Sequence, residues 1–145
     1  KNGRDIPTML DYQKHIEKES MFNTPPVFSV YVSMLTLEWL KQRGGVSEIE
    51  KINNEKALML YNEIDRNPLF EGFANLEDRS IMNATFNLLD KKLEDKFDSF
   101  CIENGINGLK GHRSVGGYRA SMYNALPLSS VSHLVKLMQK FENKI

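Results

Sequence analysis

The sequence predicts an α/β fold, more narrowly an α+β small domain: a short, mainly antiparallel sheet with helices packed on one face, preceded by two long helices. Three observations lead to this prediction. Apolar residues recur at three- and four-residue spacing over four stretches, which is typical of helices. In other, shorter stretches apolar and polar residues alternate, which is typical of strands. Start and stop signals separate these segments in the order α-α-β-β-α-β-β-α.

The N-terminal part is predicted to hold the first long helix. Its polar entry segment carries one short expected strand, near Met9–Tyr12. The helix is predicted over residues 26–42, because proline fits the first helical turn and apolar residues follow at helical spacing. Thr24 is the expected N-cap and Trp39 an expected core residue. Gly44-Gly45 ends the helix.

A second long helix and a pair of strands come next. The helix is predicted to start at Ser47, because Ser47 and Glu50 match a capping box. It is predicted to end at Asn67-Pro68. Strands are predicted over residues 69–73 and 79–89, the second from the regular alternation of apolar and polar side chains.

The last third of the chain is predicted to add two helices and two short strands. Asp90 is expected to cap the third helix, which places the single cysteine on its apolar face. Short strands are predicted over residues 108–111 and 117–123. Ser129 or Ser130 is expected to cap the final helix.

The composition excludes several classes of protein. The 145 residues are 41% hydrophobic and 26% charged, which is a globular composition. Lysine and arginine total 19, as do aspartate and glutamate, so no basic excess indicates binding to nucleic acid or to a membrane surface. The single cysteine, Cys101, fits a reducing compartment, and we expect a cytoplasmic protein. The chain starts at Lys1 instead of methionine, and we expect it to be a piece of a longer protein.

The most unusual stretch combines two arginines, a lysine and a histidine with three glycines, over residues 109–121. Arginine offers a planar fork that matches a carboxylate or a phosphate. Arg113 and Arg119 would be roughly 20 Å apart on a straight strand. Gly116-Gly117 permits a bend that would let both reach one ligand with two anionic ends. A basic surface loop with incidental glycines explains the same residues equally well.

Two further sets of residues are candidates for chemistry. Asn23-Thr24 precedes a helix start, which suits a phosphate group, although a plain N-cap is the better interpretation in isolation. His15 and His133 lack partners at metal-ligand spacing, and Cys101 fits a core position. We therefore predict no metal site and no nucleophile-base pair.

Taken together, several motifs resemble the phosphoserine aminotransferases, class V enzymes that depend on pyridoxal 5'-phosphate. The resemblance extends in order over nearly the whole chain. It rests on Asn23-Thr24-Pro25-Pro26, on Trp39-Leu40-Lys41 with Gly44-Gly45, on Lys110-Gly111-His112-Arg113-Ser114-Val115-Gly116-Gly117-Tyr118-Arg119-Ala120-Ser121-Met122-Tyr123-Asn124-Ala125, and on shorter matches such as Asn53 with Lys56-Ala57 and Arg79-Ser80 with Met82-Asn83.

The resemblance implies the C-terminal part of a fold-type I transferase. Residues 1–45 would end the large domain and link it to the small domain, residues 46–145. The implied enzyme is a homodimer of the serine pathway that transfers the amino group of glutamate to 3-phosphohydroxypyruvate, giving phosphoserine.

The resemblance also implies roles for five residues. Asn23 and Thr24 match the pair that binds the cofactor phosphate from the neighbouring subunit. Arg119 matches the arginine that holds the substrate α-carboxylate. His112 and Arg113 match the pair at the mouth where the substrate phosphate binds.

One departure from the family pattern limits what this chain does alone. Lys1-Asn2 superficially echoes the lysine that binds the cofactor, but Lys1 lies only 22 residues before Asn23 and lacks the glycine-rich surroundings. The lysine, the stacking aromatic ring and the aspartate at the pyridine nitrogen are therefore absent, so no residue is assigned as catalytic. We expect the isolated chain to be inactive. The alternatives are a free-standing phosphate- or anion-binding module and a dimerisation module.

Overall fold

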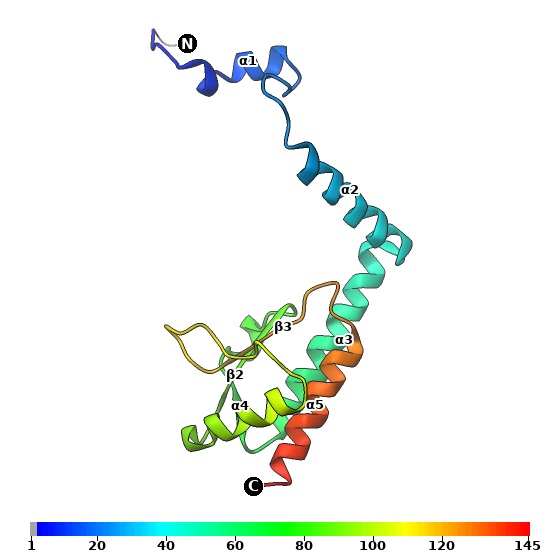
Figure 1. Ribbon diagram of the computed structural model, residues 1–145, viewed down its shortest axis with the longest axis vertical. Helices are drawn as coiled ribbons and strands as arrows, with labels where there is room; N and C mark the ends of the chain where they lie inside the picture. Colours follow the sequence, from blue (N-terminus) through cyan, green and yellow to red (C-terminus); the bar gives the residue numbers. More distant parts are fainter. Residues whose placement is uncertain (1–2) are drawn as a thin grey trace. The chain divides into compact units, whose positions relative to one another are not determined.

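The structure is a computed structural model and describes residues 3–145. The chain divides into two units, Lys1–Arg43 and Gly44–Ile145, called here the N-terminal and the C-terminal unit. Figure 1 labels their helices and most of their strands.

The N-terminal unit is helical. After a 3-10 turn over Thr8–Leu10 it forms α1, Tyr12–Glu17, and α2, Val27–Gln42. The strand expected near Met9–Tyr12 is wrong, because the Asp11 carboxylate accepts a hydrogen bond from the Gln13 amide and so starts α1. The long helix predicted from residue 26 is confirmed.

Helix α2 differs from the prediction at its start and in its packing. No side chain caps it. Thr24 is not the cap, because the N-cap position is Pro26 and the Val27 amide donates to the Pro25 carbonyl over 2.8 Å. None of the residues of α2 is buried. Trp39, expected in a core, is half-buried, and the Arg43 guanidinium lies 5.1 Å from the centre of its ring.

The C-terminal unit combines three long helices with a three-stranded sheet. The helices are α3, Gly45–Arg66; α4, Glu94–Glu103; and α5, Leu128–Glu142. The strands are β1, Phe70–Gly72; β2, Asn83–Leu88; and β3, Tyr118–Ser121. Two 3-10 turns complete it, Leu76–Asp78 and Lys91–Leu93. The expected Asp90 cap of α4 is wrong, because the Asp90 carboxylate accepts from the Lys92 amide and so caps the second 3-10 turn, and α4 itself starts without a side-chain cap.

The strands are ordered β1-β2-β3, and both pairs are antiparallel. On β2 the alternating residues Ala84, Phe86 and Leu88 are buried, as the sequence pattern predicts, whereas their neighbours are half-exposed. One face of the sheet is thus packed against helices α3, α4 and α5, and the fold class predicted for this unit is confirmed. Figure 1 shows α3 and α5 side by side.

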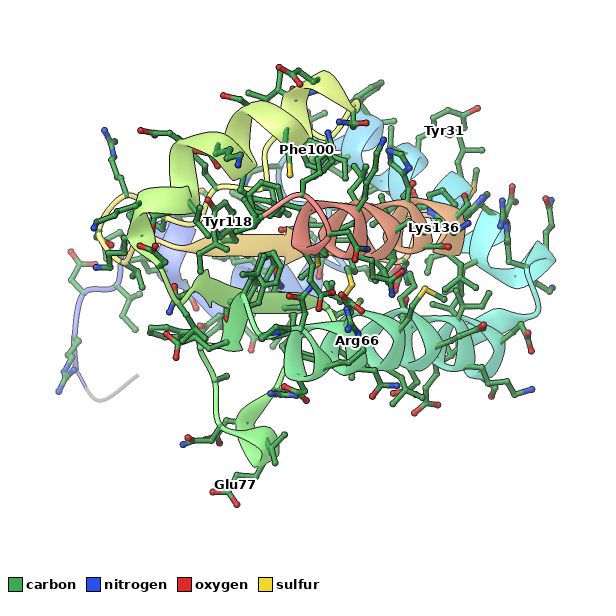
Figure 2. All side chains as sticks on the ribbon, turned by 90° about the horizontal axis from the view of Figure 1, so that it is seen from below. Tyr31, Arg66, Glu77, Phe100, Tyr118 and Lys136 are labelled. Carbon is green, nitrogen blue, oxygen red and sulfur yellow. The ribbon has the colours of Figure 1, made fainter. Side chains whose placement is uncertain are left out.

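The core lies between this face of the sheet and the three helices. Aromatic rings dominate it: Phe97 of α4 contacts Phe70, Tyr118 and Phe141 with ring centres 5.0–5.2 Å apart. Figure 2 labels Tyr118 and Phe100 in this region. The remaining buried apolar side chains are Ile49, Ala57, Leu60, Tyr61, Ile64, Ala84, Phe86, Leu88, Cys101, Ala120, Met122, Val131, Leu134, Leu137 and Met138.

Three further local predictions for this unit are wrong. Helix α3 starts at Gly45 and not at a Ser47 capping box, because Gly44 adopts a left-handed conformation (φ 95°) and turns the chain two residues earlier. Helix α5 follows Pro127 without a serine cap. The strand expected over residues 108–111 is only a single bridge from Lys110 to Tyr118.

Candidate functional site

The glycine-containing loop between α4 and β3 is closed at its base by backbone hydrogen bonds. The Gly111 amide donates to the Gly117 carbonyl over 2.8 Å. Within the loop the His112 carbonyl accepts from the amides of Val115 (2.9 Å) and Gly116 (2.8 Å). The loop is therefore a defined turn that presents residues 112–116 at one end of the sheet.

Glycine is required at the point where this loop enters β3. Gly117 has a positive φ of 62°. A side chain at Gly117 would collide with the Asn87 side chain and the Phe86 carbonyl. The close approach of the loop to β2 thus depends on this glycine, and it brings His112 to the exposed face of the sheet.

The His112 ring is oriented by its own loop. Its Nδ1 atom lies 2.7 Å from the Ser114 hydroxyl oxygen and accepts a hydrogen bond from the Ser114 amide at 3.3 Å. Because a backbone amide only donates, Nδ1 is an acceptor, and the proton of the neutral ring is on Nε2. His112 therefore presents an N–H donor, the group that an anionic ligand needs.

Strand β3 places Arg119 on the exposed face of the sheet. Its neighbours Tyr118 and Ala120 are buried, so alternation directs Arg119 to the opposite face. Thr85 of β2 is its direct cross-strand partner. The Arg119 amide also donates to the Leu109 carbonyl over 2.7 Å, which ties the strand to the start of the glycine-containing loop.

Two of the three predicted substrate-binding residues line one cavity. This cavity, of about 230 Å³, opens on the exposed face of the sheet and is lined by both His112 and Arg119. Arg113 is exposed on the same loop but is not among the lining residues. The other lining residues are Phe73, Thr85, Phe86, Asn87, Gly111, Val115, Gly116 and Tyr118.

An ion pair and a buried phenol stabilise the base of this site. The Lys110 ammonium lies 2.6 Å from the Asp98 carboxylate of α4, and this contact raises the pKa of Lys110. Burial, with Asp98 as a lesser cause, raises the pKa of the Tyr118 phenol, so Tyr118 stays neutral. The Lys110 side chain thus links the start of the loop to α4.

Sequence reasoning did not assign Phe73, Thr85 and Asn87 to the site. Thr85 and Asn87 are the polar members of the alternating pattern in β2, so the pattern did place them opposite the core. What it lacked was the strand register, which sets Thr85 beside Arg119. Phe73 joins them because its amide bonds to the Thr85 carbonyl over 3.1 Å.

The predicted cofactor-binding pair lies in the N-terminal unit. Asn23 and Thr24 are both exposed just before α2. The Asn23 amide nitrogen donates to the Met9 sulfur at 3.6 Å, a weak acceptor that a phosphate oxygen would readily replace. Lys1, which echoes the cofactor lysine in sequence, lies outside the described residues.

Residues 3–145 contain neither a candidate metal cluster nor a candidate membrane-spanning helix. This part of the chain holds no cluster of three or more histidine, cysteine, aspartate or glutamate residues placed to bind a metal ion. It also holds no helix that is long and apolar enough to cross a membrane.

The chain is similar in sequence to proteins of known family. Residues 3–134 match the family described as aminotransferase class-V. The phosphoserine aminotransferase of Flavobacterium psychrophilum is 66% identical over all 145 residues, which correspond to 41% of that protein. The chain thus spans about two fifths of the length of the curated relatives it matches.

Solved structures show the same fold. The phosphoserine aminotransferase from Bacillus circulans subsp. alkalophilus superposes with a TM-score of 0.86 and 41% identity, over 96% of this chain and 39% of that one. The PLP-bound phosphoserine aminotransferase from Trichomonas vaginalis superposes with a TM-score of 0.80 and 38% identity, over 92% of this chain and 39% of that one.

Proposed function

Because the chain belongs to the aminotransferase class-V family, we propose that it is the C-terminal part of a phosphoserine aminotransferase. The complete enzyme transfers the amino group of glutamate to 3-phosphohydroxypyruvate in serine biosynthesis, as a cytoplasmic homodimer. Residues 1–45 would end its large domain and residues 46–145 would form its small domain. The single observation that carries the substrate assignment is the cavity that both His112 and Arg119 line.

Arg119 is proposed to hold the α-carboxylate that both amino-acid substrates share. Its exposed position opposite Thr85 leaves the guanidinium available for two parallel hydrogen bonds to a carboxylate. The backbone of Arg119 lies between Thr85, its cross-strand partner on β2, and Leu109, whose carbonyl accepts the Arg119 amide, so the fork starts from a fixed point. This arrangement positions the substrate before any chemical step.

His112 and Arg113 are proposed to bind the substrate phosphate. His112 supplies the Nε2 proton as a donor, because Ser114 occupies its Nδ1 atom. Arg113, exposed one residue further along the same turn, adds a positive charge that suits a dianion. Thr85 and Asn87 line the same cavity with polar side chains.

Asn23 and Thr24 fit the phosphate group of pyridoxal phosphate by the chemistry of their donors. An amide N–H and a hydroxyl, both exposed before a helix start, are suitable partners for phosphate oxygens. When bound, the cofactor supplies the electron-withdrawing ring that transamination needs. We propose that Asn23 and Thr24 reach the cofactor of the neighbouring subunit in the homodimer.

The substrate assignment is tested in the full-length enzyme with Arg119→Lys and Arg113→Ala. Arg119→Lys keeps the charge but loses the fork, so we expect kcat/KM to fall about 30-fold or more for glutamate and for phosphoserine alike, which corresponds to roughly 2 kcal/mol. Arg113→Ala should impair phosphoserine selectively, because glutamate has no phosphate. Steady-state kinetics in both directions measure the two ratios.

The matched control is Arg66→Lys, because Arg66 pairs with Glu63 and Glu142 and does not line the cavity. It should leave both kcat/KM values within about twofold. Equal damage to both substrates from Arg113→Ala would refute the division of roles, and unchanged kinetics in Arg119→Lys would refute the carboxylate site.

The cross-subunit role of Asn23 and Thr24 is tested with heterodimers. Thr24→Ala should weaken cofactor binding in the full-length homodimer. This variant is mixed with a second variant that lacks the cofactor lysine. If the pair acts across the dimer, one site of each heterodimer combines an intact lysine with an intact Asn23-Thr24 pair. If the pair acts within its own subunit, neither site combines them. Recovery of tight cofactor binding in half of the sites is expected. No recovery in proven heterodimers would assign the pair to its own subunit.

We also propose that the 145-residue chain alone does not catalyse transamination, since the resemblance places the cofactor lysine outside it. Incubation with pyridoxal phosphate, glutamate and phosphohydroxypyruvate should release no 2-oxoglutarate, and borohydride should fix no cofactor to a single residue. Turnover, or specific labelling of Lys1, would contradict this.

A further inference from the structure

A fully buried lysine on α3 holds the loop that follows β3. Lys56 is 0% exposed. Its ammonium donates to the main-chain carbonyl oxygens of Met122 (3.1 Å), Tyr123 (2.8 Å) and Leu126 (3.2 Å). None of the ion pairs found within residues 3–145 includes Lys56. The partners of this charge are thus backbone dipoles of one segment, residues 122–126, called here the anchored loop.

The three contacts match the three N–H bonds of an ammonium group. Burial disfavours the charge and lowers the pKa of Lys56. Three carbonyl acceptors offset that cost, since charge-assisted hydrogen bonds are roughly twice as strong as neutral ones. Removal of the ammonium would leave these carbonyl groups without this donor inside the protein, so the loop depends on Lys56 for its position.

Asn53 adds a second contact from the same face of α3. It lies one helical turn before Lys56 and is 4% exposed. Its side-chain amide donates to the Asn124 side-chain oxygen over 2.8 Å. Lys56 and Asn53 together therefore bind the main chain and a side chain of the anchored loop to one rigid helix.

The anchored loop begins where β3 needs support. β3 is an edge strand, paired along its length with β2 only. On its other side the contacts found are the bridge from Lys110 to Tyr118 and the hydrogen bond from Arg119 to Leu109. Beyond Arg119, the strand end is held by β2 and by the loop that follows.

We propose that Lys56, assisted by Asn53, is a positioning residue for Arg119: it fixes the end of β3 three residues beyond the arginine and so sets where the guanidinium meets the substrate carboxylate. This inference rests on the proposed function, because it takes Arg119 to be the carboxylate-binding residue. Displacement of a substrate-holding group by about 1 Å is enough to reduce kcat/KM by up to about 100-fold.

The test uses the full-length enzyme with Lys56→Met, which removes the ammonium and keeps a long side chain of similar volume. We expect KM for glutamate and for phosphoserine to rise about tenfold, while kcat changes less than about threefold and cofactor affinity stays unchanged. A purely structural role would lower the fraction of folded enzyme, which reduces kcat and leaves KM unchanged. Lys51→Met is the matched control, because Lys51 lies on the same helix and is exposed beside Glu48; its KM should not change.

A second readout does not depend on activity. Hydrogen exchange of the amides of residues 119–126 in the full-length protein should accelerate about tenfold in Lys56→Met and stay unchanged in Lys51→Met. If the wild-type enzyme shows no transamination, the proposed function fails, and the positioning role of Lys56 toward Arg119 fails with it. Accelerated exchange in Lys56→Met would in that case still establish that Lys56 holds the anchored loop. Accelerated exchange with an unchanged KM in an active enzyme would overturn the positioning role and leave Lys56 structural.

Asn124→Ala keeps the proposal testable if Lys56→Met does not fold. Asn124 is exposed, so its truncation removes the bond to Asn53 without opening the core. We expect KM to rise about threefold with kcat unchanged, because one hydrogen bond that holds the anchored loop is lost. An unchanged KM together with unchanged exchange of residues 119–126 would overturn the proposal.

Discussion

Helices α2 and α5 have nearly equal lengths, 16 and 15 residues, and opposite roles. α2 is the more apolar of the two, and its apolar side chains lie on all sides. Nevertheless it buries no residue, whereas α5 buries five. Hydrophobicity alone therefore did not decide which helix enters a core. A helix enters a core when its apolar side chains form a stripe on one side and other elements of the structure face that stripe, and only α5 meets both conditions.

The same contrast separates the two units. The C-terminal unit has a continuous aromatic and aliphatic core under its sheet. The N-terminal unit presents Val27, Phe28 and Leu37 of α2 with at least 64% of each side chain exposed. A helix that is apolar all round is typical of one covered by other segments. This surface is consistent with the proposal that α2 belongs to a larger enzyme.

Deletion of one unit is expected to have the largest effect on the contrast between the two units. A chain of residues 44–145 should keep one cooperative thermal transition, because its buried cluster lies entirely within it. A peptide of residues 1–43 should show no cooperative transition at all. Circular dichroism against temperature measures both. A missing transition in residues 44–145 would show that the core needs the N-terminal unit.

Cys101 provides a probe that reports on the core of one unit only. Burial, with a smaller contribution from Asp98, raises the pKa of its thiol to about 12. At pH 8 the thiolate fraction should therefore be about a thousandfold below that of a free cysteine. Iodoacetamide should therefore label the Cys101 thiol about a thousandfold more slowly in the folded chain than in the chain unfolded in urea. Mass spectrometry measures both labelling rates. Fast labelling without urea would mean that the core opens readily.

Two phenylalanine truncations compare a core position with an exposed one. Phe97→Ala should lower the free energy of unfolding by about 3–5 kcal/mol, because Phe97 is fully buried among three aromatic rings. Phe28→Ala on α2 should change it by less than about 0.5 kcal/mol, because Phe28 is 80% exposed. Urea denaturation measures both. Similar losses would contradict the contrast between the units.

Glu63→Gln addresses the polar contact that joins α3 to α5. Glu63 is buried, and its carboxylate accepts from Arg66, Asn67 and Gln139 over 2.8–3.0 Å. Arg66, labelled in Figure 2, also pairs with Glu142 of α5. Burial alone would raise the pKa of Glu63, but these hydrogen bonds outweigh it and lower the pKa. We expect a loss of about 2 kcal/mol at pH 7.

The pH dependence of this effect has a definite sign. Because the pKa of Glu63 is lower in the folded chain, its contribution is fully present above the ordinary glutamate value, about 4.3, and is lost as the pH falls through the lowered pKa. The difference between the wild type and Glu63→Gln should therefore shrink below about pH 4. A constant difference from pH 7 to pH 3 would contradict this assignment.

The sequence determined the features that depend on neighbouring residues. Alternation over Ala84, Phe86 and Leu88 predicted the buried face of β2, and the proline after Asn67 predicted the end of α3. The resemblance also singled out His112 and Arg119. These signals are readable because side-chain direction and backbone preference repeat with the period of a helix or strand.

The tertiary structure alone decided what depends on residues far apart in the chain. The register that sets Thr85 beside Arg119 and the cavity shared with Phe73 come from strand pairing. The complete burial of Lys56 comes from a loop 66–70 residues further on. A lysine on a helix is ordinarily exposed, and only three converging carbonyl groups make its burial favourable. Long-range contacts select among the faces and registers that local patterns leave equivalent, which is why the sequence pattern alone could not reveal the anchored loop.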